Sequence, residues 1–394
     1  MGEDKSKARP TLSEKYQLAA SIISRQGIMP LPVSDTTVSI MKNVIEEQEE
    51  ELDLICAFAA KGSQTLDELK ESSGFSEQQI EIVAKSLAGK GLLFNQPSSS
   101  GLMVYRLLPL MNVGLLEYKF MGPLKGDRKE LELARLFEKL MSETRDQIQA
   151  NYENLKPIFE NAPPFDRTVP SRTNQEGKPI RVIPVQRTIG APTEVIVPSQ
   201  RIEEIIEKFD EIAVGHCFCR QRRATLGDPC KNEAPLQNCF TFGKSARHTV
   251  TQGFAKAITK EEAIRIMKEA ENAGLVHKAF HPGSQVDRPE TSICNCCKDC
   301  CDAVRLWREG TLPLINATYF LSVIDKENCS GCGACVDRCP TDAIALDDDG
   351  LAIRDETHCL GCGVCARFCP EGAISLQEGL RRVFIPPPRK SLPA

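Results

Sequence analysis

Cysteine is the residue type in this chain whose number and placement could do chemistry. The 394 residues include 18 cysteines, and apart from Cys56 all of them lie between Cys217 and Cys369. Thiolates bind soft metal ions, and they also exchange disulfides. A disulfide framework is typical of small secreted domains, and the polar segment 1–10 has no hydrophobic signal sequence. These cysteines therefore favour metal binding, and the lone Cys56 is interpreted as a buried small hydrophobic residue.

One motif occurs twice, thirty residues apart, over 323–346 and 353–376. Each copy reads C-x2-C-x2-C-x3-C-P, in which three closely spaced cysteines can wrap one cluster face and the proline carries the fourth away. Zinc sites also use C-x2-C pairs, but two complete copies with both prolines favour iron–sulfur clusters. The repeat resembles the dicluster bacterial ferredoxin family over residues 320–378. The resemblance implies one-electron transfer at low potential, with no substrate chemistry at the clusters.

In two-cluster ferredoxins the fourth cysteine of each motif ligates the cluster of the other motif. We therefore expect one [4Fe–4S] cluster on Cys329, Cys332, Cys335 and Cys369 (cluster 1), and the other on Cys359, Cys362, Cys365 and Cys339 (cluster 2). Glycines at positions 331, 333, 361 and 363 let the backbone approach the sulfur atoms closely. Ile344 and Ile374 are expected to shield the clusters from water.

The other cysteines are concentrated in a middle segment, residues 211–315. They are Cys217, Cys219, Cys230, Cys239, Cys294, Cys296, Cys297, Cys300 and Cys301. Thiolates this close repel one another unless a metal supplies positive charge. We interpret them as candidate ligands of one or two further iron–sulfur clusters. The alternatives are a zinc site on Cys217, Cys219, Cys230 and Cys239, and redox-active thiols without metal; spacing alone does not pair the nine thiols.

The two cysteine-rich segments differ in charge. Residues 211–310 contain fifteen Lys or Arg and twelve Asp or Glu, whereas residues 316–380 contain four and eleven. Cations near a cluster stabilise its reduced form and raise its potential. We therefore expect a middle cluster to be the electron sink. His216 and His277 could be ligands or donors to ligands, although a single histidine is more often a solvent-facing or hydrogen-bonded side chain.

Several catalytic patterns are absent from the sequence. Cys296 and Cys300 have the first spacing of the C-x3-C-x2-C loop used in adenosylmethionine radical chemistry, but position 303 is Ala303. Neither G-x-G-x-x-G nor G-x-x-x-x-G-K-[ST] occurs, so nucleotide or flavin binding is not indicated. No run of eighteen apolar residues exists, and the net charge is −5. We therefore expect a cytoplasmic protein without a membrane span.

Residues 44–120 are predicted to form a winged-helix-like domain. A helix over 43–60 is followed by helices that begin at Thr65 and Ser76, and then by strands at 92–94 and 103–107. The segment 44–96 contains eleven acidic and four basic residues. This charge would repel DNA phosphates, whose neutralisation supplies most of the affinity for DNA. We expect the domain to dock a protein, with DNA an unlikely partner.

The remaining segments complete an α+β, multidomain fold. We expect a polar lead-in at 1–43, a helical and Pro-rich connector at 121–210, and the cysteine-rich domain at 211–315. A ferredoxin domain at 316–380 and a flexible or docking tail at 381–394 follow. Helical patterns cover 128–152, 202–209 and 260–273, and the eight prolines of 157–200 indicate extended chain or linker.

The order of motifs also resembles an uncharacterised family of dicluster ferredoxin-domain proteins from anaerobic bacteria and archaea. In that family a winged-helix-like part precedes an HCxCR segment and an ICNCCxxCC segment, which match residues 216–220 and 293–301 here; residues 273–277 match as well. The resemblance implies an additional iron–sulfur centre in the middle segment.

These patterns predict an iron–sulfur electron-transfer protein rather than an enzyme. It would relay electrons between a low-potential donor and a partner, either a flavoprotein or another iron–sulfur oxidoreductase. One rival interpretation is a redox-sensing transcription regulator that uses the winged helix. Another is a reductase with a catalytic middle cluster.

Overall fold

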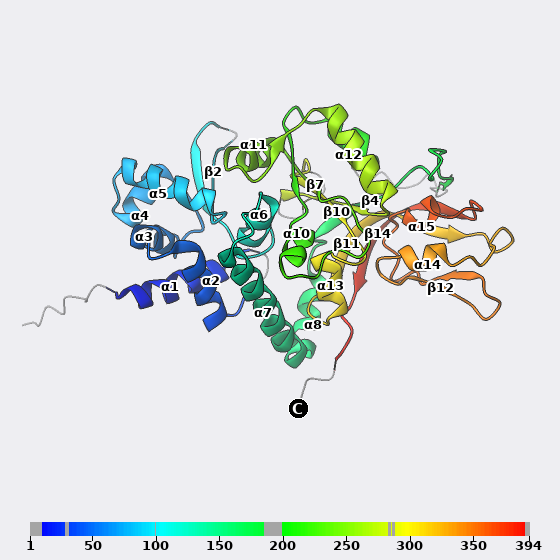
Figure 1. The fold of residues 1–394 in the computed structure, drawn as a ribbon, viewed down its shortest axis with the longest axis horizontal. Helices are drawn as coiled ribbons and strands as arrows, with labels where there is room; N and C mark the ends of the chain where they lie inside the picture. Colours follow the sequence, from blue (N-terminus) through cyan, green and yellow to red (C-terminus); the bar gives the residue numbers. More distant parts are fainter. Residues whose placement is uncertain are drawn as a thin grey trace, which may run out of the picture. The chain divides into compact units, whose positions relative to one another are not determined.

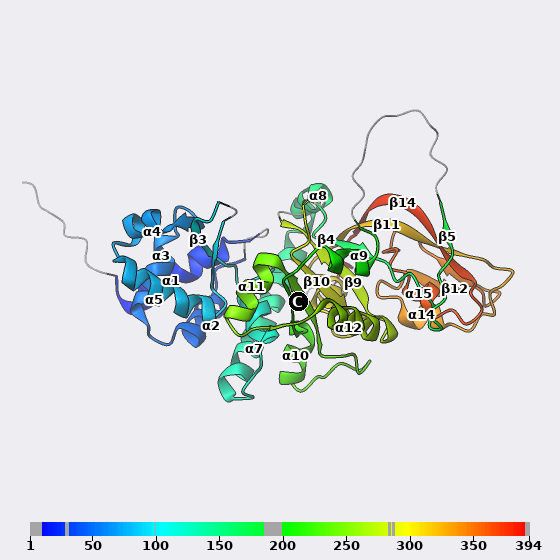
Figure 2. The same cartoon turned by 90° about the horizontal axis from the view of Figure 1, so that it is seen from above.

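The computed structural model describes residues 10–27, 31–98, 100–184, 199–282, 285 and 288–390. The chain forms two compact units, Met1–Leu140 and Met141–Ala394. Both units contain helices and strands (Figures 1 and 2), so the fold is α+β, as the sequence predicts. None of the described helices is long and apolar enough to cross a membrane.

The first unit packs helices against a three-stranded sheet of order β1-β3-β2. Its elements are α1 (Leu12–Ser24), α2 (Asp35–Ile45), α3 (Glu49–Ala57), β1 (Ser63–Thr65), α4 (Leu66–Ser73), α5 (Glu77–Gly89), β2 (Leu93–Pro97), β3 (Met103–Leu107) and α6 (Leu115–Met121). Helix α7 (Arg128–Ala150) begins in this unit and ends in the next. Thr65 and Ser76 form the capping boxes that start α4 and α5. The helices at these caps and the β2–β3 hairpin agree with the predicted elements.

Most of the described residues in the segment 1–43, expected as a polar lead-in, are helical. The segment contains α1 and most of α2. Thr11 caps α1 through a capping box with Glu14, and Tyr16, Ile22 and Ile23 are buried on one side of the helix. The sequence expectation failed because charged residues interrupt this short apolar pattern.

The single helix expected over 43–60 is also corrected. Helix α2 ends at Ile45 and α3 begins at Glu49. Glu46 and Glu47 between them have φ values of 51° and 62°, a left-handed conformation that a continuous α-helix cannot contain. The chain therefore turns at this point, where apolar periodicity alone suggested one helix.

The second unit is organised around a nine-stranded sheet of order β5-β14-β11-β4-β9-β10-β7-β6-β8. Its strands are β4 (Asp166–Val169), β5 (Val182–Ile183), β6 (Ile212–His216), β7 (Gln237–Phe242), β8 (Lys256–Ala257), β9 (Val276–Phe280), β10 (Ser292–Cys296), β11 (Leu314–Ile324) and β14 (Ile374–Ile385). Strands β12 (Ile344–Leu346) and β13 (Ala352–Arg354) pair separately. The helices are α8 (Tyr152–Asn161), α9 (Ile202–Glu207), α10 (Phe218–Thr225), α11 (Gly243–Thr251), α12 (Lys260–Asn272), α13 (Asp302–Arg308), α14 (Ala334–Arg338) and α15 (Val364–Arg367). One sheet thus joins the ferredoxin-like repeat to the cysteine-rich middle segment.

Strand β4 links the two parts of this sheet. It runs parallel to β11, with Arg167 opposite Ala317, and antiparallel to β9, with Val169 opposite His277. Arg167 and Val169 are fully buried. Part of the Pro-rich segment expected as wrapping chain or linker is therefore an internal strand, and residues 185–198 lie outside the described residues.

Strand β14 runs past the boundary predicted for the ferredoxin domain. Residues 381–385 pair with β11, where the sequence analysis placed the start of a flexible or docking tail. Val383 and Ile385 are buried against Trp307 and Leu314, and this packing explains why the strand continues. Figure 2 shows β5 beside β14 at the end of the sheet that carries α14 and α15.

The sheet has an apolar face and a sulfur-rich face. Helices α9 and α12 cover the apolar face, where Ile205 and Ile266 pack with Phe240 and Ile293. Side chains alternate along a strand, so the cysteines on either side of Asn295 point to the face opposite Ile293. Helices α10 and α13 lie on that second face (Figure 1).

A buried polar network joins β4 to the chain between β9 and β10. Arg167 Nη2 donates to Glu290 Oε1 at 2.8 Å, and Arg167 Nε donates to His281 Nε2 at 3.3 Å. The proton of His281 is therefore on Nδ1, which lies 2.6 Å from the carbonyl oxygen of Arg288. Burial lowers the pKa of His281.

We expect His281 to make the protein less stable in mild acid. Above the ordinary histidine pKa of about 6.5 this side chain is neutral in both the folded and the unfolded chain. Below that pH the unfolded chain takes up a proton that folded His281 takes up only at lower pH, so the free energy of unfolding decreases. His281→Gln removes this contribution, and chemical unfolding of both proteins on either side of about pH 6.5 measures it. An unchanged pH dependence in His281→Gln would show that the residue does not titrate differently on folding.

Candidate iron–sulfur site

The first set of ferredoxin-like cysteines surrounds a hollow near the surface. The hollow is lined by Cys329, Cys332, Cys335 and Cys369, together with Ala352 and Ile374 among others. These are the four cysteines that the sequence assigns to cluster 1, three from the first motif and one from the second. Cys332 is exposed, whereas Cys335 is buried.

The second set lies deeper in the fold. Cys362 and Cys365 interact electrostatically with Cys339 and Cys359, the other two cysteines assigned to cluster 2. Burial raises the pKa of Cys362 to about 12 and that of Cys365 well above the ordinary value. Without metal these thiols would stay protonated, and metal binding releases such protons.

Backbone N–H groups point at sulfur in the same way in both motifs. Ala343 N donates to Cys339 Sγ at 3.2 Å, and Ala373 N donates to Cys369 Sγ at 3.3 Å. The isoleucine that follows each of these alanines is buried beside the cysteines, as expected. Hydrogen bonds of this kind orient metal ligands and, in iron–sulfur proteins, tune the reduction potential.

Gly361 shows why the motif requires glycine. Its φ is +62°, and a Cβ there would lie 2.0 Å from the carbonyl oxygen of Phe320 in β11. Gly333 has a similar φ of +75°, but nothing lies within 4 Å of its Cβ position. Alanine at either position would have a strained backbone, but only alanine at 361 would also collide with a neighbouring strand.

We expect Gly361→Ala to lose the iron of cluster 2, about four atoms per chain. Gly333→Ala pays only the cost of a left-handed backbone, on the order of 1 kcal/mol, and should keep its iron. Iron analysis and the EPR spectrum of both reduced proteins measure the difference. Equal iron content in the two variants would mean that β11 moves aside without harm to the cluster.

Six of the nine middle cysteines form one group on the sulfur-rich face of the sheet. This six-thiol group consists of Cys217, Cys219, Cys239, Cys294, Cys296 and Cys301. Hydrogen-bond contacts connect these thiols in pairs. Cys219 contacts Cys217 and Cys301, Cys296 also contacts Cys301, and Cys239 contacts Cys294. They come from β7, β10 and the starts of α10 and α13. Segments far apart in the sequence thus bring six sulfur atoms together.

Buried cations surround the six-thiol group. Lys278 Nζ lies 3.1 Å from both carboxylate oxygens of Asp166, and its charge also interacts with Cys296 and Cys301. Arg220 is 4% exposed, and its Nε and Nη2 atoms have no ordinary hydrogen-bond acceptor among the described residues. A buried cation requires compensating negative charge, and a thiolate-bound cluster would supply it. The donor atoms and the charge therefore fit an iron–sulfur cluster.

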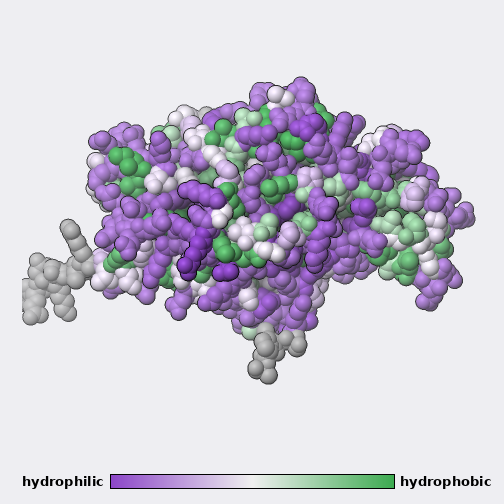
Figure 3. Space-filling model, in the orientation of Figure 1, coloured by the Kyte–Doolittle hydropathy of each residue, from purple (hydrophilic) through white to green (hydrophobic). Residues whose placement is uncertain are grey.

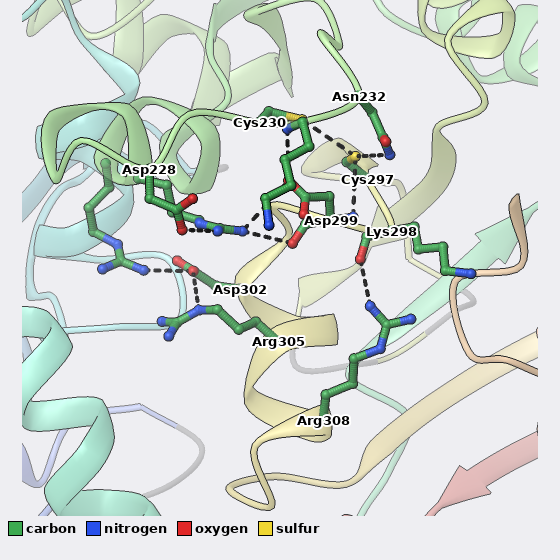
Figure 4. Close-up of polar contacts among 12 residues, drawn as sticks. Asp228, Cys230, Asn232, Cys297, Lys298, Asp299, Asp302, Arg305 and Arg308 are labelled. Atoms are coloured by element: carbon green, nitrogen blue, oxygen red, sulfur yellow. Dashed lines mark hydrogen bonds and ion pairs between the residues drawn. The ribbon is translucent and has the colours of Figure 1, made fainter. Parts of the chain in front are cut away.

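The other three middle cysteines form a separate three-thiol group of Cys230, Cys297 and Cys300. Their sulfur atoms all lie within 4.8 Å of one another. Figure 4 shows Cys230 and Cys297 facing each other, with 3.7 Å between the sulfurs and the Asn232 amide 3.3 Å from Cys297 Sγ. The hydrogen bond with Cys300, helped by the N–H of Asp299, lowers the pKa of Cys297 to about 5.

Middle thiols and residues of the ferredoxin-like repeat share one cluster of packed side chains. Its buried members are Cys296 and Cys301 from the six-thiol group, Val364 and Phe368 from the second motif, and Val276 and Val304; Cys294 and Cys362 are partly buried and pack against it. The two sulfur sites are therefore joined by packed side chains.

The two candidate histidines have different surroundings. His277 Nδ1 lies 2.5 Å from Asn295 Oδ1, and its Nε2 lies 3.5 Å from Glu271 Oε1 in α12. It therefore faces the apolar side of the sheet as a hydrogen-bonded side chain, away from the thiols. His216 ends β6 beside Cys217, and its Nδ1 is buried without a hydrogen-bond partner among the described residues.

Sequence reasoning missed Lys278 and Asp166. A lysine on the same side of the strand as Val276 and Phe280 was the available signal, because buried lysines are rare unless paired. Cys56 lies in α3 and is only partly buried, whereas the sequence interpretation made it a buried small hydrophobic residue. This partial burial raises its pKa to about 11.

Comparisons with known proteins assign a class to the C-terminal part of the chain. Residues 322–376 match the family described as "4Fe-4S dicluster domain". A "Probable ferredoxin" from Methanosarcina thermophila is 55% identical over 29 residues, which are 7% of this chain and 50% of that protein. The chain thus spans half the length of this curated relative. No solved structure matches the chain. This is an iron–sulfur protein with a dicluster domain, and that domain supports electron transfer.

Proposed function

We propose that this protein relays electrons between a low-potential donor and a partner oxidoreductase. Two [4Fe–4S] clusters would occupy the dicluster domain with the ligand sets given above, and at least one further cluster would occupy the six-thiol group. The observation that carries this proposal is the shared cluster of packed side chains, in which Val364 and Phe368 of the second motif pack with Cys296 and Cys301. Sites that share buried side chains are close enough for a relay, and the chain itself needs no catalytic step.

The exposure of the cysteines suggests the order of the relay. Cluster 1 lies nearest the surface, since Cys332 is exposed. Leu346 and Ile353 nearby are 43% and 41% exposed, and Figure 3 shows apolar residues gathered at the end of the second unit that bears α14 and β12. An external protein would exchange electrons at cluster 1. Cluster 2 would then pass electrons to the middle cluster, whose cationic surroundings make it the electron sink.

The first unit supports a docking role rather than DNA reading. The predicted winged-helix domain would present α5, on which Glu77, Gln78, Gln79 and Glu81 are exposed. Ile82 on the same helix is 62% exposed. An acidic surface with an exposed apolar residue suits a protein partner and repels phosphate. Specific binding to DNA in a gel shift at physiological salt would reverse this proposal in favour of a transcription regulator.

Iron and sulfide content tests the relay proposal. Anaerobically purified protein should contain about twelve or more irons per chain, against about eight for the dicluster domain alone. Cys301→Ser should lose about four of them while the EPR spectrum of the reduced ferredoxin pair persists. About eight irons in both proteins would remove the middle cluster from the proposal.

A further inference from the structure

The three-thiol group has a tighter geometry than a cubane cluster requires. Zinc–sulfur bonds of about 2.3 Å place the sulfurs of one tetrahedral zinc site about 3.8 Å apart. The thiolates of a [4Fe–4S] cluster bind four different irons, so their sulfurs lie on the order of 6 Å apart. The separation between Cys230 Sγ and Cys297 Sγ is 3.7 Å, and the third sulfur lies within 4.8 Å of both. We propose that Cys230, Cys297 and Cys300 hold a mononuclear zinc ion, separate from the iron–sulfur cluster of the six-thiol group.

The dicluster domain provides an internal comparison for these distances. All eight of its motif cysteines are among the described residues, and no three of their sulfurs gather within 4.8 Å of one another. The sulfurs of the dicluster domain are therefore arranged more openly than those of the three-thiol group. This difference separates two kinds of metal site within one chain.

Hydrogen bonds hold the two loops of the three-thiol group in place. The backbone N–H of Lys231 donates to Asp299 Oδ2 at 3.0 Å, which ties the loop of Cys230 to the loop of Cys297 (Figure 4). Two donors reach Cys297 Sγ, the amide of Asn232 at 3.3 Å and the backbone N–H of Asp299 at 3.4 Å. Such donors orient metal ligands and stabilise thiolate charge.

Charge and ligand number also suit zinc. Three thiolates and one Zn²⁺ leave a single negative charge, and the buried guanidinium of Arg220 interacts with both Cys230 and Cys300. Zinc prefers thiolate ligands in tetrahedral geometry. No fourth His, Cys, Asp or Glu atom of the described residues joins the three sulfurs, and zinc sites with three protein ligands take water as the fourth.

Metal analysis of the full-length protein tests the zinc site. This inference rests on the proposed metal-binding role of the middle segment. Zinc content tests the inference, whereas iron content tests the electron relay, so the two can fail separately. Anaerobically purified protein should contain about one zinc per chain. Cys297→Ser should lose the zinc and keep its iron, whereas the matched control Cys56→Ser should keep both. Asn232→Ala retains all three ligands and should lose zinc to a chelator about 10-fold more readily.

Zinc-edge X-ray absorption of the unmodified protein makes the test independent of folding in a variant. We expect three sulfur neighbours at about 2.3 Å and one lighter neighbour. Loss of iron in place of zinc from Cys297→Ser would overturn the inference and assign these residues to a cluster. A zinc-free protein with a Cys297–Cys300 disulfide in mass spectrometry would overturn it in favour of a redox-active dithiol. Either result leaves the iron count of the relay as a separate measurement.

Discussion

Arg167→Met is expected to lower the free energy of unfolding by about 3–5 kcal/mol, the usual cost of leaving one partner of a buried ion pair unpaired. The side chains of Arg167 and Glu290 are 0% and 1% exposed, and the pair lies 2.8 Å apart. Lys208 reaches the second carboxylate oxygen only at 3.5 Å and is 41% exposed, so it compensates in part. Because Arg167 lies in β4, the loss should also loosen the strand between the ferredoxin-like repeat and the middle segment.

Chemical unfolding measures this loss of stability, and two further variants show whether the unpaired charge causes it. Arg247→Met removes an exposed ion pair with Glu211 and should leave the unfolding midpoint nearly unchanged, because exposed pairs contribute little. The double variant Arg167→Met with Glu290→Leu should recover much of the loss, since it leaves no buried charge unpaired; Lys208 also loses Glu290 but is 41% exposed. An Arg167→Met protein as stable as the control would show that Glu290 finds another partner or takes up a proton.

Cys365→Ser is expected to remove cluster 2, with a loss of about four irons per chain. Cys365 is buried among the other cysteines assigned to this cluster, and its thiol interacts with Cys339, Cys359 and Cys362. Serine is a poor ligand for iron in such a site, so the remaining three cysteines would hold at most an incomplete cluster. In the proposed relay cluster 2 passes electrons from cluster 1 to the six-thiol group, so reduction of a middle cluster by an external ferredoxin should also slow markedly.

Iron analysis and stopped-flow reduction of the same samples check both consequences. Cys56→Ser is the matched control, because it also removes a thiol whose pKa is raised by burial, to about 11, but in α3 of the first unit. This control should keep its iron and its reduction rate. Unchanged iron in Cys365→Ser would contradict the ligand set of cluster 2. Iron loss with an unchanged rate at the middle cluster would contradict the order of the relay.

Local sequence patterns predicted the helices and motifs that are determined by residues close together in the sequence. Capping residues at Thr65 and Ser76 marked the starts of α4 and α5 correctly. The cysteine motif predicted the class of the C-terminal domain, because the spacing of its cysteines determines how they can bind a cluster. Residues 322–376 match the dicluster family.

Strand pairings and thiol groups that join segments far apart in the sequence could not be predicted. Strand β4 reads as Pro-rich connector, yet it lies between β11 and β9, over 100 residues away in sequence. The division of the nine middle thiols also has no signal in their spacing. Cys296 and Cys297 are adjacent, but alternation along and beyond β10 sends them to different groups. The winged-helix domain and the ligand sets stay predictions.

An EPR-monitored redox titration of the anaerobic full-length protein, compared with Cys301→Ser, tests the central claim most directly. We predict at least one reduced-cluster signal beyond the ferredoxin pair, absent from Cys301→Ser, that appears at a higher potential than the pair because buried cations surround it. Identical spectra of the two proteins would contradict a relay that ends in the middle segment. An extra signal that appears only below the potential of the ferredoxin pair would contradict it as well.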